Sequence, residues 1–208
     1  MKEYNYYYFD FDGTLANSFP SLIHPFQVAF ATEGILLSED DVNELMHMAF
    51  VQMCDKLGIC EEKRMLHVYE VMTSEMNKDE EISKISIFPD AKEILLKLKR
   101  MGKKIAIVSG NHTDYIHRVM EIHHLSECFD FYVGGNSTKE AKPHPEPLLK
   151  AMKLSGNPGK KECIYIGDSL QDVACAENAE IDGILIDRKG EYTDYSGKKI
   201  LSLKELYD

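Results

Sequence analysis

The feature that most constrains the fold is the alternation of short apolar runs with amphipathic segments from Phe88 onwards. The apolar runs are short, as buried strands are, and the segments between them have apolar side chains at the 3.6-residue spacing of a helix. Strands that alternate with helices form parallel sheets, because two parallel strands need a crossover connection. We therefore expect an α/β fold with a doubly wound, Rossmann-like parallel sheet. The expected strands are Ile105–Val108, Phe131–Val133, Cys163–Ile166 and, as the last one, Gly183–Ile186; the expected helices are Pro89–Arg100, about His112–His124, one after Pro145 and one through Ala176.

Another strand is expected near the N-terminus, where the run Tyr4–Phe9 leads into Asp10 and Asp12. Side chains two residues apart in an extended chain share a face, with Cα atoms about 6.5 Å apart, so both carboxylates can address one ligand. Two anions this close repel each other, and one tends to stay protonated unless a cation lies beside them. Since Mg²⁺ prefers oxygen ligands, the pair predicts a magnesium site. The simpler alternative is a strand that runs into an ordinary Asp12-Gly13 turn.

The stretch after this strand has helical periodicity and no strand-like run. Pro20 stands in the first turn of an expected helix that Gly34 ends, and Ser38 with Asp41 resembles a capping box at the start of a second helix. Further helical patterns cover residues 51–57 and 61–76. We expect an all-helical inserted domain over residues 16–86, and an α/β core domain made of residues 1–15 and 87–208.

Composition limits the classes of partner. The chain has 208 residues, of which 28% are charged and 44% hydrophobic, and a formal net charge of −11. Nucleic acids and anionic membranes are bound through clustered Lys and Arg, so we expect neither as a partner. A small phosphorylated metabolite remains compatible, because a metal ion and a few local cations can outweigh distant negative charge. The first residues lack an apolar signal core, and no apolar run approaches the length of about 18 residues of a membrane span, so we expect a cytoplasmic protein.

The five cysteines and eight histidines follow no disulfide or metal-binding pattern. The cysteine number is odd and no CxxC pair occurs, so we expect reduced thiols in the core. No HExxH motif is present, and His117 with Glu121 is expected to lie on the exposed face of a helix.

Polar residues follow the expected strands. Ser109 comes directly after Ile105–Val108, and its hydroxyl with the amides of Gly110 and Asn111 could bind a phosphate where a helix begins. A turn with a helix-capping serine is the alternative. Gly134-Gly135 also follows a strand, but it does not continue as GxGxxG and we set it aside.

Lys142 precedes a proline in the run Ala141-Lys142-Pro143-His144-Pro145. Proline disfavours helical geometry in the residue before it, so the ammonium is expected on a stiff turn ahead of the next helix. An exposed lysine in a turn is the alternative. Asp168 ends another buried strand, and Asp172 lies one helical turn later, so both carboxylates can face one ion. Stabilisation of the helix start by these acids is the alternative.

In chain order, Asp-Phe-Asp-Gly-Thr-Leu, the serine after the second strand, Lys-Pro-x-Pro and Gly-Asp-Ser-x-x-Asp resemble the four motifs of the haloacid dehalogenase superfamily. The phosphoglycolate phosphatase type with a helical cap after the first motif is the most similar. The chain departs from that type at Gly110, where asparagine is frequent, and at Asn17, where relatives have aspartate. Ala179-Glu180 also replaces a usual alanine-glycine pair.

The resemblance implies a function and a set of roles. The chain would be a Mg²⁺-dependent phosphatase that hydrolyses a small phosphorylated metabolite. Asp10 would attack phosphorus to form an aspartyl-phosphate, and Asp12 would serve as general acid and base. The phosphate-binding residues would be Ser109, Gly110, Asn111 and Lys142, and the metal ligands would be Asp10, the main-chain carbonyl of Asp12, Asp168 and Asp172.

Three alternatives stay open at this point. A phosphosugar mutase could use the same core, although the position twelve after the nucleophile is Leu22 and no cap histidine matches. A phospho-acceptor switch of the receiver type also combines clustered acids, a hydroxyl residue and a lysine. A catalytically inactive binding protein would be expected to lack a key polar residue, and none is missing. His24, His47 and Arg64 are the candidates for contacts to a leaving group, and neither the substrate nor the oligomeric state is encoded in a recognisable pattern.

Overall fold

The computed structural model describes residues 2–46, 48 and 50–207. It divides into two compact units, one made of residues 1–17 with 86–208 and the other of residues 18–85. Ala16, Asn17 and Ser86, which we expected in the insertion, fall in the first unit. There β2 (Ala16–Asn17) and β3 (Ser86–Ile87) form an antiparallel ribbon that the sequence did not indicate.

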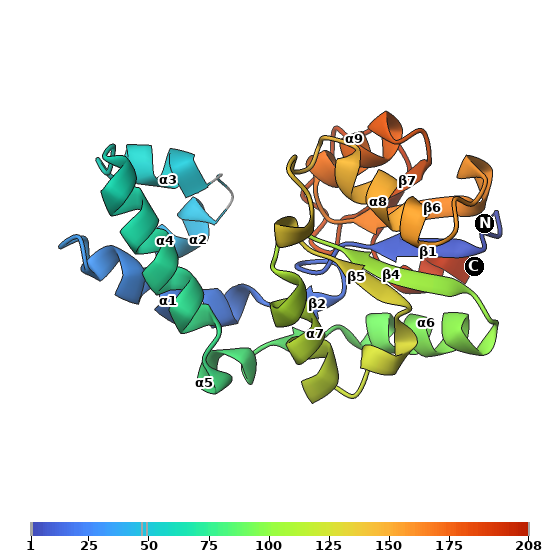
Figure 1. Cartoon of the computed structure of the whole chain (residues 1–208), viewed down its shortest axis with the longest axis horizontal. Coiled ribbons are helices and arrows are strands. Elements are labelled where there is room, and N and C mark those ends of the chain that lie inside the picture. The colour runs from blue at the N-terminus through green and yellow to red at the C-terminus, as the bar shows by residue number, and fades with distance from the viewer. Residues whose placement is uncertain (1, 47, 49, 208) are drawn as a thin grey trace. The chain divides into compact units, whose positions relative to one another are not determined.

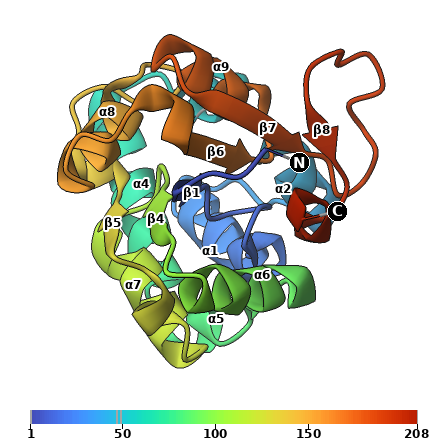
Figure 2. The ribbon, with the colours of Figure 1, turned by 90° about the vertical axis from the view of Figure 1, so that its right-hand side faces the viewer.

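The first unit contains a six-stranded sheet in the order β5-β4-β1-β6-β7-β8, and all its pairings are parallel (Figures 1 and 2). The expected doubly wound α/β fold is therefore confirmed. The expectation that Gly183–Ile186 is the last strand was wrong, because a two-residue strand, β8, pairs with the outer edge of β7. The strands are β1 (Tyr6–Phe9), β4 (Lys104–Val108), β5 (Phe131–Val133), β6 (Cys163–Gly167), β7 (Asp182–Ile186) and β8 (Lys199–Ile200).

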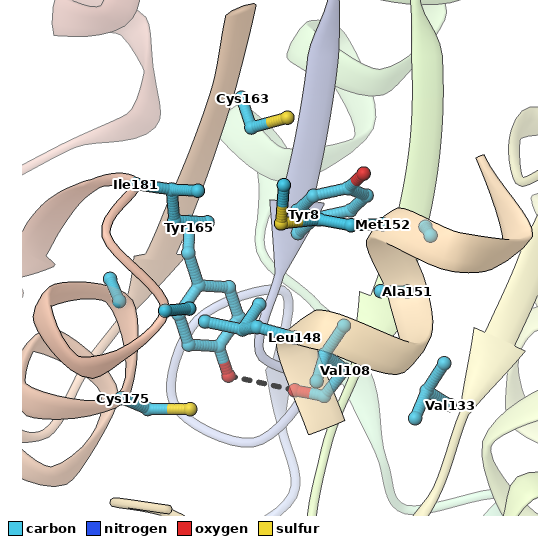
Figure 3. Close-up of a cluster of buried hydrophobic side chains, with 13 residues drawn as sticks. Tyr8, Val108, Val133, Leu148, Ala151, Met152, Cys163, Tyr165, Cys175 and Ile181 are labelled. Carbon is cyan, nitrogen blue, oxygen red and sulfur yellow. Dashed lines mark hydrogen bonds between the residues drawn. The ribbon is translucent and has the colours of Figure 1, made fainter. Parts of the chain in front are cut away.

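Helices cover both faces of this sheet: α8 and α9 lie on one face, and α6 and α7 on the other (Figure 2). Alternate strand residues face opposite sides, so Tyr8 and Tyr165 join a core cluster with Leu148 and Met152 of α8 (Figure 3). The helices are α6 (Pro89–Arg100), α7 (Thr113–Ile122), α8 (Glu146–Leu154) and α9 (Leu170–Asn178), with short 3₁₀ turns at Ser126–Cys128, Gly135–Ser137, Lys160–Glu162 and Leu203–Tyr207.

The second unit is helical, as expected. Pro20 lies in the first turn of α1, and Ser38 and Asp41 form a reciprocal capping box at the start of α2. Its own core includes Phe26, Phe30 and several of the methionines. Its helices are α1 (Phe19–Ala31), α2 (Glu39–Leu45), α3 (Phe50–Lys56), α4 (Glu62–Met76) and α5 (Asp79–Ile82), the last of which was not expected.

Four of the five cysteines are buried free thiols, but Cys60 is exposed, which corrects the expectation that all are core residues. His117 and Glu121 form the expected pair on an exposed helix face, with Nδ1 and Oε2 3.5 Å apart. None of the helices within the described ranges is both long and apolar enough to cross a membrane.

Candidate active site

The strand order places the site. The chain leaves β1 for one side of the sheet through β4 and β5, and for the other side through β6 and β7, so the order reverses between β1 and β6. Open α/β sheets bind ligands at the carboxyl ends of the strands at such a point. Phe9 pairs with Ile166 in register, and the amide of Asp10 donates to the carbonyl of Ile166 at 2.8 Å. Asp10 and Asp168, which follow these two strands, are therefore brought to the same edge of the sheet.

Lys142 reaches this edge from the loop between β5 and α8. Its Nζ lies 2.8 Å from Oδ1 of Asp10 and 2.5 Å from Oδ1 of Asp172. The side chains of these aspartates are 8% and 1% exposed, and that of Lys142 is 15% exposed. The Lys142 ammonium lies between two nearly buried carboxylates and so links its own loop to the end of β1 and to α9. The alternative of an exposed lysine in a turn is wrong.

Tyr165 adds a third partner for the same ammonium. Its hydroxyl lies 3.2 Å from Nζ of Lys142 and 3.0 Å from Oδ1 of Asp172, and it donates to the carbonyl of Val108 at 2.8 Å, the bond drawn in Figure 3. Because Tyr165 belongs to β6, one of the two middle strands, its phenol holds Lys142 and Asp172 against the sheet. Sequence reasoning missed this residue. The signal was a hydroxyl in an otherwise apolar strand, since a buried tyrosine hydroxyl needs a hydrogen-bond partner.

Asp172 has partners on both of its oxygens. Oδ1 accepts from Lys142 and lies 3.0 Å from the hydroxyl of Tyr165, while Oδ2 accepts hydrogen bonds from the amide of Ser169, at 3.0 Å, and from its hydroxyl. Ser169 in turn caps α9, so the helix-start alternative describes a real interaction. The carboxylate therefore positions Lys142 in this structure, and its predicted role as a metal ligand stays a prediction.

Asp12 and Asn111 lie in contact at this edge of the sheet. The amide nitrogen of Asn111 donates a short hydrogen bond to Oδ2 of Asp12, and the main-chain amide of Asn111 points to the hydroxyl of Ser109 at 3.3 Å. Ser109 is nearly buried at the end of β4, whereas Gly110 is exposed. Helix α7 begins only at Thr113, so these amides precede the helix rather than open it. The structure thus brings the predicted phosphate-binding segment beside the predicted general acid.

Gly134 and Gly135, which we had set aside, support this segment. A Cβ on Gly135 would lie 2.2 Å from the carbonyl oxygen of Gly110, and one on Gly134 would lie 2.5 Å from that of Asn111. Only glycine lets the loop after β5 approach the loop after β4 this closely. The absence of a side chain at Gly134 and Gly135 leaves space for the loop after β4.

The charges of the site respond to burial and to one another. Burial raises the pKa of Asp10 well above its usual value, and Asp172 and Asp168 add to this while Lys142 opposes it. Burial, with the negative charge of Asp172, also raises the pKa of Asp168 to about 7. For Asp172, burial is outweighed by Lys142 and the hydrogen bonds, which hold its pKa low. Burial likewise disfavours the Lys142 ammonium, yet Asp10 and its other neighbours raise the pKa of that group well above normal.

These residues fit a divalent cation. Single carboxylate oxygens of Asp10, Asp168 and Asp172 all lie within 4.8 Å of one another, and oxygen donors suit a hard ion such as Mg²⁺. The carboxylate of Asp168 also packs on the turn after β1, because a Cβ on Gly13 would come within 2.0 Å of its Oδ2. Lys142 is already shared by Asp10 and Asp172, so additional positive charge is needed before Asp168 and Asp10 ionise together.

The candidate leaving-group residues of the helical unit have internal partners. Nδ1 of His24 lies 2.9 Å from the buried Glu81, and Nε of Arg64 lies 2.6 Å from Glu33. His47 lies outside the described residues.

The fold and the arrangement of these side chains define a doubly wound α/β enzyme with a carboxylate-lysine site at the carboxyl edge of its sheet. The sequence model of the haloacid dehalogenase-like hydrolases matches residues 7–186. The chain belongs to that family, as its motifs had indicated.

Individual relatives agree with this assignment. A phosphoglycolate phosphatase of Colwellia psychrerythraea is 34% identical over 98 residues, but the match covers only 47% of this chain and 43% of that protein. Pyrophosphatase PpaX of Bacillus cereus is 26% identical over 175 residues, which are 82% of this chain and 77% of that protein. The crystal structure of a haloacid dehalogenase-like hydrolase from Bacteroides fragilis superposes with a TM-score of 0.86 at 26% identity, over 98% of this chain and 100% of that one.

Proposed function

We propose that this chain is a Mg²⁺-dependent phosphatase that hydrolyses a small phosphorylated metabolite through an aspartyl-phosphate on Asp10. The observation that carries the proposal is the contact of the Lys142 ammonium with Asp10, at 2.8 Å, within a cluster of carboxylates. Asp10 is nearly buried directly after β1, the other middle strand, so its position is fixed and its solvation is poor. Both properties favour a nucleophile that attacks in line rather than a carboxylate that only binds.

In the first half of the reaction, a carboxylate oxygen of Asp10 forms a bond to phosphorus while the bond to the leaving oxygen breaks. Asp12 gives its proton to that oxygen, so the alcohol leaves in neutral form. The side chain of Asn111 donates to Asp12 and so holds its carboxyl group in place. Lys142 and the hydroxyl of Ser109 stabilise the charge that develops on the phosphoryl oxygens.

In the second half, Asp12 accepts a proton from a water molecule as the water oxygen bonds to phosphorus. The bond from phosphorus to Asp10 then breaks, which releases inorganic phosphate and restores the carboxylate. One residue thus serves as acid and then as base, and it needs no proton from elsewhere for a complete turnover.

Asp10, Asp168 and the main-chain carbonyl of Asp12 would hold the magnesium ion, with Asp172 as a further candidate. The bound ion would lower the pKa values of its carboxylate ligands and neutralise charge on the phosphoryl group. Uncatalysed phosphate-ester hydrolysis is slow enough that an enzyme must lower the barrier by about 20 kcal/mol, so several such contributions have to act together.

The helical unit would be the cap domain that selects the leaving group. The names of the relatives guide the choice of substrates for a test: one is a phosphoglycolate phosphatase and one a pyrophosphatase. Phosphoglycolate and pyrophosphate therefore belong in a substrate panel that also contains sugar phosphates and nucleoside monophosphates.

The test measures phosphate release from 4-nitrophenyl phosphate by the purified protein with Mg²⁺, with EDTA, and after Asp10→Asn. We expect activity only in the first case. Asp114, an exposed aspartate in the first turn of α7, provides the control, because Asp114→Asn changes the same chemical group outside the site. Equal activity of wild type, Asp10→Asn and the EDTA-treated protein would refute the proposal.

A further inference from the structure

Beyond the acids and the lysine, one cation in the first unit lies against the turn that carries the catalytic residues. Arg188 follows β7 and is separated by most of the chain from Gly13 and Thr14. Its Nε donates to the carbonyl of Gly13 at 3.1 Å, and its Nη2 donates to the carbonyl of Thr14 at 2.7 Å. Both of these residues are buried, so their carbonyls need donors from the protein.

Two other groups fix the guanidinium. Its Nη1 donates to Oδ2 of Asp90 at 3.0 Å, and its Cζ lies 3.8 Å from the centre of the Phe88 ring. Oδ2 of Asp90 also accepts the hydroxyl of Ser202 and the amide of Leu203, each at 2.8 Å. The side chains of Arg188 and Asp90 are only 16% and 10% exposed. A planar fork held by a carboxylate and stacked on a ring keeps its remaining donors in a fixed direction.

The position of this turn matters for chemistry. Gly13 directly follows Asp12, and a Cβ on Gly13 would overlap Oδ2 of Asp168, so the turn already touches an acid of the site. The amides of Gly13, Leu15 and Ala16 bond within residues 11–16, whereas the Gly13 and Thr14 carbonyls are held from outside by Arg188. Loss of that fork would free the turn to move against Asp168.

We infer that Arg188 is a positioning residue for phosphoryl transfer, because it fixes the turn that presents Asp12 to the metal and the substrate. Its Nε, Nη1 and Nη2 all bond protein groups, so Arg188 would act through the turn and not on the substrate itself. The inference rests on the proposed function. Lysine cannot replace it fully, because a single ammonium cannot copy the planar arrangement of donors to Gly13, Thr14 and Asp90.

The test compares Arg188→Met and Arg188→Lys with wild type by Mg²⁺ titration calorimetry on the substrate-free protein and by steady-state kinetics. Substitution of residues that orient metal ligands typically lowers metal affinity or activity by about 10–100-fold. We therefore expect Arg188→Met to weaken Mg²⁺ binding and to lower kcat, each by about tenfold or more. KM for 4-nitrophenyl phosphate should change by less than about threefold, since the phosphate-binding residues stay in place. The Mg²⁺ affinity and kcat of Arg188→Lys should lie between those of wild type and Arg188→Met.

Lys103→Met provides the matched control. Lys103 is also a largely buried cation of the first unit, 9% exposed, and it bonds Glu3 and Asn5 at the start of β1, away from the carboxyl edge. The Lys103→Met variant should have a lower melting temperature than wild type, with unchanged Mg²⁺ affinity and kcat. If Arg188→Met behaves in the same way as Lys103→Met, Arg188 is only structural and the inference is overturned.

A second variant covers the case in which Arg188→Met does not fold. Asp90→Asn keeps an oxygen acceptor but loses the charge that holds the guanidinium, and it should weaken Mg²⁺ binding in the same direction, by about threefold or more. Unchanged binding and kcat in Asp90→Asn would then overturn the inference. A wild-type protein without phosphatase activity would refute the proposed function itself, and the inference with it. An active wild type with insensitive variants refutes only the role of Arg188.

Discussion

The hydroxyl of Tyr165 allows the stability of the core to be separated from the chemistry of the site. Tyr165→Phe removes one buried hydroxyl and leaves the ring in place. The carbonyl of Val108 loses a donor at 2.8 Å, and the Lys142–Asp172 pair loses its shared third partner. A buried polar group deprived of its partner costs about 1–3 kcal/mol, so we expect the free energy of unfolding to fall by that amount.

Tyr8→Phe is the matched control for this change. Tyr8 lies on β1 in the same core cluster, and its hydroxyl bonds Oγ of Ser155 at 2.9 Å. Ser155 still donates to the carbonyl of Ala151 at 3.0 Å when Tyr8 is replaced, so no partner is stranded. We expect Tyr8→Phe to cost about 1 kcal/mol, which is the net value of one ordinary hydrogen bond.

Urea unfolding gives both free energies, and hydrolysis of 4-nitrophenyl phosphate gives kcat. Lys142 keeps its two carboxylate partners in Tyr165→Phe, so its charge survives and only its placement loosens. We expect kcat to fall by about tenfold, since small misplacements of catalytic groups have effects of this size or larger. Tyr8→Phe should retain the wild-type kcat. Equal kcat values for the two variants would show that Lys142 does not depend on the phenol, and would refute the reasoning.

Two further predictions concern the turn after β1 and the carboxylate that holds Arg188. Gly13→Ala should reduce activity by about 100-fold, because the φ of Gly13 is +68° and the added Cβ would overlap Asp168. Gly34→Ala is the control, because Gly34 has a similar φ of +76° but open space around it. It should cost only about 1 kcal/mol of stability and leave kcat unchanged. Burial disfavours the charged form of Asp90, but hydrogen bonds from Arg188, Ser202 and Leu203 outweigh it and lower its pKa. The ionised carboxylate of Asp90 therefore contributes fully to stability above the unfolded-state pKa of about 3.9, and this contribution is lost as the pH falls below that value. The difference in unfolding free energy between wild type and Asp90→Asn should accordingly be constant near pH 7 and shrink below about pH 4. A gap that persists unchanged at pH 3 in urea titrations, or an inactive Gly34→Ala, would contradict these expectations.

The parts of the fold that could be predicted are those whose cause is local in the sequence. Apolar runs such as Cys163–Ile166 define their strands, and the capping box of Ser38 and Asp41 defines a helix start, because each pattern depends on residues within one or two turns. The short strand β8 (Lys199–Ile200) could not be found in this way. It has no run of its own, and it exists because the edge of β7 offers unpaired main-chain groups to a returning segment.

The same distinction separates the site residues that could be predicted from those that could not. Asp10 and Asp12, or Asp168 and Asp172, lie close in sequence, and parallel strands bring their ends to one edge of the sheet. The partners of Tyr165 and Arg188 are far away in the chain, and only the completed fold shows that a phenol meets Lys142 or that a guanidinium meets Thr14. The predicted site residues can be recognised from local spacing, whereas the residues that hold them in place depend on tertiary contacts.

The glycines after β5 show why a motif search misses such supporting residues. Gly134-Gly135 does not continue as GxGxxG, so no phosphate-binding pattern in the sequence includes it. The structure gives these glycines another purpose, because any side chain at Gly135 would overlap the carbonyl oxygen of Gly110. The loop from Ser109 to Asn111 can lie beside Asp12 only if the neighbouring loop leaves it this space. A glycine pair that matches no phosphate-binding pattern can therefore still shape the predicted phosphate-binding segment, through the space that it leaves for the neighbouring loop.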